Sequence, residues 1–142
     1  MKVRDVMTEK PIHIHKDETV AVAARTLTHY NIGAVPVCST DGRLCGMVTD
    51  RDMVTRCLAA GKDPEKTRVS DVMTGGVITA GPDMKATEAA GIMGARQIRR
   101  LPVVENGRLC GIVSLADLAV NEKSDACAGV ALSQISSNIS TR

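Results

Sequence analysis

Two stretches of the sequence decide the fold, because the second closely repeats the first: GRLCGMVTDRD at residues 42–52 and GRLCGIVSLAD at residues 107–117. Each starts as a strand pattern of apolar and small residues and ends as a helix start. In each, a hydroxyl and a carboxylate stand three residues apart, Thr49 with Asp52 and Ser114 with Asp117. The chain therefore encodes one strand-to-helix junction twice.

The repetition extends over most of the chain. With an offset of 66 residues, VRDVMT at 3–8 aligns with VSDVMT at 69–74, and VPV at 35–37 aligns with LPV at 101–103. Self-similarity of this quality indicates two copies of one structural unit. The sequence predicts a first repeat at 1–61, a linker at 62–68, a second repeat at 69–122 and a partly disordered C-terminal tail at 123–142.

Each repeat is predicted to follow the order β-α-β-β-α. Short strands are expected at 11–14 and 77–80, and hairpins are expected to turn at Asp41-Gly42 and Asn106-Gly107. The second helices are expected at 50–60 and 115–122. The first helices present apolar faces at i, i+3, i+4 and i+7, and Asp17 or Thr19 and Asp83 are their expected N-caps. The residues of these faces are Val20, Ala23, Ala24 and Leu27 in the first repeat and Ala86, Ala89, Ala90 and Met93 in the second.

The predicted fold class is α+β, with the two repeats packed as a pseudo-two-fold pair. One repeat of about 60 residues has a small core and leaves a sheet face half covered, so the two repeats are expected to pack together. Met53, Val54, Cys57 and Leu58 form an apolar surface wider than one repeat needs for its own core. This surface predicts a homodimer.

Composition excludes several classes of function. Tyr30 is the only aromatic ring in 142 residues, which argues against stacking on single-stranded nucleic acid. The net charge of +2 gives no strong attraction to nucleic acid or membrane. No stretch has the length or apolar character of a membrane span or signal core, so a cytoplasmic protein is expected.

The cysteines and histidines leave alternatives open. Five cysteines at irregular spacings fit buried thiols in a reducing compartment, although a redox-sensing role is a second interpretation. His13 and His15 share a strand face and, with Cys38, could ligate a metal. No arrangement of the three histidines matches a protease or triad spacing, so no enzyme activity is expected.

The two strand-to-helix junctions carry the candidate chemistry. Helix starts of this kind suit anions, but Thr49 with Asp52 and Ser114 with Asp117 also fit capping boxes that need no ligand. A carboxylate would repel phosphate, yet it suits ribose hydroxyls. The second repeat adds Arg99 and Arg100 where the first has glycine and alanine, which predicts two unequal sites.

The recurring DVMT, VPV or LPV, and G-x-x-[ST]-x-x-D motifs resemble the cystathionine β-synthase (CBS) domain, over residues 1–122. The chain is similar to small bacterial stand-alone CBS pairs of the hypoxic-response type. The resemblance implies clefts between the repeats that bind AMP, ADP or ATP, with S-adenosylmethionine or NADH as second choices, and no required cofactor. It implies ribose at Asp52 and Asp117, hydroxyls of Thr49 and Ser114 beside ribose and phosphate, phosphate at Arg99 and Arg100, and the base near main chain at Ile12 and Ile78.

The sequence therefore predicts a non-catalytic regulatory module. Ligand between the repeats would favour one of two arrangements of the repeats, and an unknown protein partner would read the change. The alternatives are a ligand-independent interaction module and a redox- or metal-responsive protein based on the cysteines and histidines.

Overall fold

A computed structural model of the chain describes residues 1–119 and Ile135. It contains two compact units, and both cut across the repeat boundaries. The α1 unit spans Ile12–Val77, whereas the α3 unit joins Met1–Pro11 to the chain from Ile78 onward. Each unit therefore combines the helices and hairpin of one repeat with the VRDVMT or VSDVMT segment of the other.

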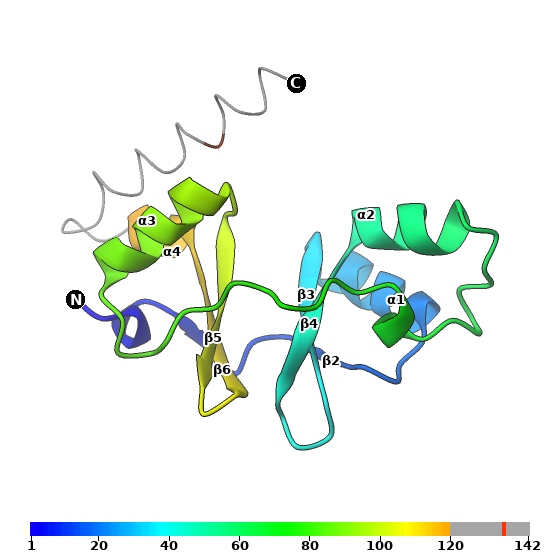
Figure 1. Ribbon diagram of the computed structural model, residues 1–142, viewed down its shortest axis with the longest axis horizontal. Coiled ribbons are helices and arrows are strands. Elements are labelled where there is room, and N and C mark those ends of the chain that lie inside the picture. Colours follow the sequence, from blue (N-terminus) through cyan, green and yellow to red (C-terminus); the bar gives the residue numbers. More distant parts are fainter. Residues whose placement is uncertain (120–134, 136–142) are drawn as a thin grey trace. The chain divides into compact units, whose positions relative to one another are not determined.

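The α1 unit contains a three-stranded sheet in the order β2-β3-β4. β2 (Ile14–His15) runs parallel to β3 (Ala34–Cys38), and β3 runs antiparallel to β4 (Leu44–Thr49). The hairpin between β3 and β4 turns through the predicted position, with Gly42 at a φ of 84°. Figure 1 shows this hairpin and the helices that follow it.

Two helical segments accompany this sheet. Helix α1 (Val20–Tyr30) begins at Thr19, whose hydroxyl accepts a hydrogen bond from the Val22 N–H at 3.3 Å. Helix α2 (Asp50–Met53) follows β4 without a loop and continues as the π-helix η2 (Val54–Leu58). The apolar face predicted for α1 faces the core, since three of its four residues are buried and the fourth packs against them.

The α3 unit repeats this plan around a sheet of order β1-β6-β5. β5 (Arg100–Glu105) and β6 (Arg108–Ser114) form the antiparallel hairpin, and Asn106 and Gly107 both have positive φ, at 53° and 80°. Positive φ at both central residues gives a two-residue turn the twist that matches its strands.

Segments from the N-terminus complete the α3 unit. The short helix η1 (Val3–Asp5) leads into β1 (Thr8–Glu9), which pairs antiparallel with β6, as the blue segment beside the hairpin in Figure 1 shows. Helix α3 (Ala86–Arg96) precedes the hairpin and α4 (Leu115–Ala119) follows it. The counterpart of η1 in the α1 unit is η3 (Val69–Asp71).

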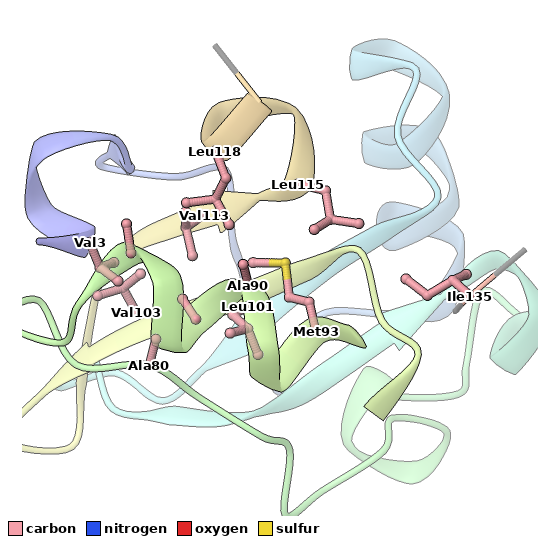
Figure 2. Packing of buried hydrophobic residues seen from close by; sticks show 12 residues of the cluster. Val3, Ala80, Ala90, Met93, Leu101, Val103, Val113, Leu115, Leu118 and Ile135 are labelled. Atoms are coloured by element: carbon pink, nitrogen blue, oxygen red, sulfur yellow. The ribbon is translucent and has the colours of Figure 1, made fainter. Parts of the chain in front are cut away.

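Both cores consist of aliphatic side chains and methionine. In the α3 unit, Met93, Leu101 and Leu118 are fully buried, and all four predicted face residues of α3 lie in this cluster. Figure 2 shows the cluster between the helices and the strands of this unit. Ile135 also belongs to it, with 4% of its surface exposed. No helix within the described residues is both long and apolar enough to cross a membrane.

The expected strands at 11–14 and 77–80 are shorter or absent. Of the first, only Ile14 lies in a strand, together with the next residue, His15, and in the second a single bridge joins Ala80 to Val103. Each stretch is short because only one or two of its residues pair with the neighbouring strand, β3 for Ile14 and β5 for Ala80.

Asp83 is not the N-cap of α3. The cap is Lys85, which makes no side-chain cap bond, and the Asp83 carboxylate instead accepts a hydrogen bond from the Arg4 guanidinium at 2.7 Å. That bond lowers the pKa of the Asp83 carboxyl. The ion pair ties the N-terminal segment to the α3 unit, as Arg68 does with Asp17 at 3.2 Å in the α1 unit.

The structure tests the expected second helix at 50–60 in full and the one at 115–122 only as far as Ala119. The first turns from α to π geometry at Val54 and ends at Leu58. The second runs from Leu115 to Ala119, where the described residues end. The expected tail at 123–142 lies outside the described residues apart from Ile135.

A close backbone approach holds each unit together. A Cβ added at Gly46 of β4 would collide with the Thr74 carbonyl oxygen and lie 3.0 Å from the Met73 Sδ. A Cβ added at Gly111 of β6 would lie 2.5 Å from the Met7 Sδ and 3.1 Å from the Thr8 carbonyl oxygen. Glycine in these strands therefore marks the place where the Met-Thr segment of the other repeat crosses the strand.

We expect Gly46→Ala to lower the free energy of unfolding by about 1–3 kcal/mol, since the Thr74 carbonyl that it meets belongs to the backbone and cannot turn aside. Gly111→Ala should cost less, because it first meets the flexible side chain of Met7. Urea denaturation measures both. Gly91→Ala is the control: it lies in α3 with open space around it and should raise the unfolding free energy by up to about 1 kcal/mol. Equal changes in unfolding free energy at the three glycines would contradict the close approach of the Met-Thr segments to β4 and β6.

Candidate functional site

The first strand-to-helix junction, residues 49–52, is called the first ledge. Its Thr49 hydroxyl accepts the Asp52 N–H at 3.0 Å, and the Asp52 Oδ2 accepts the Thr49 N–H at 3.0 Å. The two residues thus satisfy each other's backbone donors as a capping box. Asp52 is buried, with 8% of its surface exposed.

The second ledge, residues 114–117, has the same geometry. The Asp117 N–H donates to the Ser114 hydroxyl at 3.1 Å, and the Ser114 N–H donates to the Asp117 Oδ2 at 2.8 Å. Both predicted hydroxyl–carboxylate pairs are therefore brought together, each within one unit. The ledges follow the strand glycines directly, since Thr49 and Ser114 stand three residues after Gly46 and Gly111.

Each capping box uses only one oxygen of its carboxylate. Oδ2 binds the backbone N–H in both ledges, and Oδ1 takes no part in the box. An ionised carboxylate accepts about four hydrogen bonds. Each Asp can therefore cap its helix and still accept hydrogen bonds from two neighbouring hydroxyls of one ligand, as the 2′ and 3′ hydroxyls of a ribose would offer.

The predicted phosphate residues stand beside the second ledge. Arg100 is paired with Ser114 in the β5–β6 register, and the Arg99 carbonyl accepts the Leu115 N–H at 3.0 Å. Both arginines are exposed, and neither forms an ion pair with any of residues 1–119. The main chain of both arginines therefore lies next to the ledge, Arg100 at the first position of β5 and Arg99 just before it.

Of the predicted neighbours of a base, Ile12 is the first residue of the α1 unit and Ile78 the first residue of the second segment of the α3 unit. Ile12 is exposed over 39% of its surface, whereas Ile78 packs against the core of the α3 unit. The exposed apolar side chain of Ile12 is available to a ligand or a neighbouring chain.

Comparison with known proteins decides the family. Residues 3–59 and 69–121 each match the CBS domain. The chain belongs to the CBS domain family. It is 42% identical over 134 residues to the CBS domain-containing protein YhcV of Bacillus subtilis, with 94% of each chain covered. It is 37% identical over 116 residues to Hypoxic response protein 1 of Mycobacterium tuberculosis, covering 82% of this chain and 81% of that one.

Solved structures of CBS proteins share the fold. Hypoxic Response Protein I with two coordinated zinc ions matches with a TM-score of 0.78 and 36% identity, over 85% of this chain and 98% of that one. The CBS domain pair of protein MJ0100, in complex with 5′-methylthioadenosine and S-adenosyl-L-methionine, matches with 0.71 and 30%, over 84% and 94%. CBSX2 in complex with AMP matches with 0.72 and 25%, over 82% and 91%. The predicted pair of CBS repeats of α+β class is confirmed.

Arg56 is a residue of this CBS pair that the sequence analysis did not single out. Its Nη1 donates to the carbonyl oxygens of Val72 at 2.9 Å and Met73 at 3.1 Å, and to the Thr74 hydroxyl at 3.2 Å. The same nitrogen lies 3.7 Å from the Asp52 Oδ1. Arg56 therefore joins the first ledge to the segment that crosses β4. The i, i+4 spacing of Asp52 and Arg56 was the available signal.

The cysteines and histidines of the CBS pair form no metal centre within the described residues, where no group of three or more His, Cys, Asp or Glu side chains could hold a metal ion. His15 and Cys38 are paired in the β2–β3 register, but both ring nitrogens of His15 have partners. The Asp17 N–H donates to Nδ1 at 3.1 Å, and Nε2 lies 2.8 Å from the Thr40 hydroxyl.

We expect Thr49→Ala and Ser114→Ala each to lower the free energy of unfolding by about 1 kcal/mol, because each removes the hydroxyl that caps a helix. Thermal and urea unfolding with circular dichroism measures the loss. Thr55→Ala is the matched control: its hydroxyl bonds the Arg51 carbonyl at 2.8 Å inside the same helical segment and caps nothing. A cap substitution no more costly than Thr55→Ala would contradict the capping role.

Cys38 is expected to resist alkylation in the folded protein. Burial, with a smaller contribution from Cys45, raises the pKa of its thiol to about 11. At pH 8 the reactive thiolate is then about one molecule in a thousand, against about a quarter for a thiol of ordinary pKa. Iodoacetamide labelling followed by peptide mass spectrometry should find Cys38 unmodified in folded protein and modified in urea. Rapid labelling of folded protein at this residue would contradict its burial.

Proposed function

We propose that this CBS pair is a non-catalytic regulatory module that binds adenosyl ligands at its ledges, with AMP, ADP or ATP as the expected nucleotides. The observation that carries the proposal is the shared ledge geometry, in which Asp52 and Asp117 each give Oδ2 to the helix cap while Oδ1 takes no part in it. At the first ledge Oδ1 lies 3.7 Å from the Arg56 Nη1, so a ribose there would share this oxygen with the guanidinium. A ribose offers two adjacent hydroxyl donors to such an oxygen. Capping and ribose binding are compatible under this proposal.

Structural relatives support the ligand class. A CBS pair 30% identical to this chain was solved with 5′-methylthioadenosine and S-adenosyl-L-methionine, and one 25% identical was solved with AMP. These compounds share an adenosine group and differ at the 5′ position. The shared group is the part that the carboxylate and hydroxyl of each ledge would hold. The proposal requires access to adenine nucleotides, so it places the protein in the cytoplasm.

The proposed response passes through the backbone near the first ledge. Arg56 lies between the Asp52 carboxylate and the backbone of Val72 and Met73, which lead toward the end of the α1 unit at Val77. A ligand that engages Asp52 changes the electrostatic environment of Arg56. Ligand affinity that differs between two conformations shifts their populations, and a partner protein would read that shift.

The homodimer predicted from the sequence forms part of the proposal. Of the four predicted apolar residues, Met53 and Cys57 are buried, while Val54 and Leu58 are 54% and 60% exposed. Val54 and Leu58 are one helical turn apart and so lie on one face. This exposed pair is the surface through which we propose that two copies associate.

Calorimetric titration with AMP, ADP, ATP, S-adenosylmethionine and NADH tests the function directly. Saturable binding of at least one adenine nucleotide is expected, and Asp117→Asn should weaken it at the second ledge, since the neutral amide is a poorer acceptor for ribose hydroxyls. Unfolding curves of the same variant show whether the fold is kept. If none of the five compounds gives a heat of binding, the proposal is wrong.

Arg100→Ala is expected to weaken AMP binding about tenfold, because a guanidinium–phosphate hydrogen bond is charge-assisted. Binding of adenosine, which has no phosphate, should stay unchanged. Arg108→Ala is the control, since it removes an exposed arginine at the far end of the same hairpin. An equal loss for adenosine and AMP would show that Arg100 does not contact phosphate.

A further inference from the structure

The two repeats share one backbone junction but place opposite charges on it. The Asp50 N–H donates to the Gly33 carbonyl at 3.1 Å, and the Leu115 N–H donates to the Arg99 carbonyl at 3.0 Å. Asp50 of the first repeat thus corresponds to Leu115 of the second, and Gly33 corresponds to Arg99. The first junction carries an acidic side chain where the second carries a basic one.

The Asp50 carboxylate occupies the space beside Gly33. A Cβ added at Gly33 would lie 3.7 Å from the Asp50 Oδ2, so the carboxylate covers the point from which an arginine side chain starts in the second repeat. Its other oxygen, Oδ1, accepts the Arg51 N–H at 2.8 Å, which fixes its orientation. Leu115 is instead 7% exposed and packs in the core of its unit.

The arginines near the first ledge do not neutralise the negative charge of the Asp50 carboxylate beside Gly33. Arg51 is the next residue along a helical turn, where successive side chains point about 100° apart. Arg56 directs its Nη1 to the carbonyls of Val72 and Met73. The first ledge therefore presents Asp50 and Asp52 where the second presents Asp117 with Arg99 and Arg100.

We propose that the first ledge selects adenosyl ligands whose 5′ substituent carries no negative charge, and that Asp50 is the residue that repels phosphate there. The inference rests on the proposed function, because it assigns ligand chemistry to the same two ledges. A negative charge within a few ångströms of a phosphate at the protein surface weakens binding by about three- to tenfold, and salt reduces the effect. The second ledge, with its two arginines, would hold the phosphate-bearing ligand.

Proteins with one working ledge test this selectivity. In the Asp117→Ala variant only the first ledge keeps its carboxylate. If this variant does not fold, Asp117→Asn is used instead of it. In the Asp52→Asn variant only the second ledge keeps its carboxylate. Calorimetric titration of each with adenosine and with AMP gives the two affinities. We expect the first ledge to bind adenosine at least threefold more tightly than AMP, and the second ledge to show the reverse order.

Asp50→Asn in the Asp117→Ala protein should then raise AMP affinity about three- to tenfold and leave adenosine affinity unchanged. The gain should shrink as ionic strength increases. Glu65→Gln is the matched control, since it removes one negative charge from the same unit at a residue that pairs with Arg25 at 3.5 Å. It should leave both affinities unchanged.

The outcomes separate this inference from the proposed function. If the unmodified protein binds none of AMP, ADP, ATP, S-adenosylmethionine and NADH, the proposed function fails and the assignment to Asp50 fails with it. If it binds, but the first ledge alone binds AMP as tightly as adenosine, or binds neither, only the selectivity is overturned. Asp50→Asn without effect on AMP would likewise overturn the role of Asp50 while leaving nucleotide binding intact.

Discussion

The close approach of backbone to strand at Gly46 and Gly111 is the constraint on which the rest of the structure depends. Thr74 and Met7 lie so near these glycines that a side chain on either strand would displace them. A segment from the other sequence repeat therefore lies against each sheet: β1 pairs with β6 in the α3 unit, and a single bridge joins Thr74 to Met47 of β4 in the α1 unit. The ledges begin three residues after the glycines, so the contact that assembles each unit also sets the place of its ledge.

The ledges show how one pair of side chains can serve structure and binding together. A threonine or serine caps the helix, an aspartate three residues later returns the hydrogen bond, and a single carboxylate oxygen suffices for that task. The remaining oxygen is the chemical basis for the proposed ribose contact. In both ledges the three-residue spacing of hydroxyl and carboxylate thus indicates a helix start. It indicates ligand binding only where the neighbouring groups suit a ligand.

Differences between the ledges arise from side chains on a shared backbone. The hydrogen bonds from Asp50 to Gly33 and from Leu115 to Arg99 have nearly the same length, so the main chain follows one path twice. Charge then varies freely on that path, with an aspartate at one junction and arginines at the other. Two ligand preferences can arise in this way without any change in fold.

The sequence by itself determined the two repeats, the hairpin turns, the apolar faces of α1 and α3, and the pairing of Thr49 with Asp52 and Ser114 with Asp117. These features depend on contacts between residues a few positions apart, which periodicity and turn chemistry record. Only the tertiary structure decided that each unit exchanges its DVMT segment with the other repeat, that Asp83 pairs with Arg4 instead of capping α3, and that Arg56 joins Asp52 to Val72 and Met73. Apart from the pair of Asp52 and Arg56, those contacts join residues at least 16 positions apart in the chain, and no local pattern specifies which distant segment a strand or a guanidinium will meet.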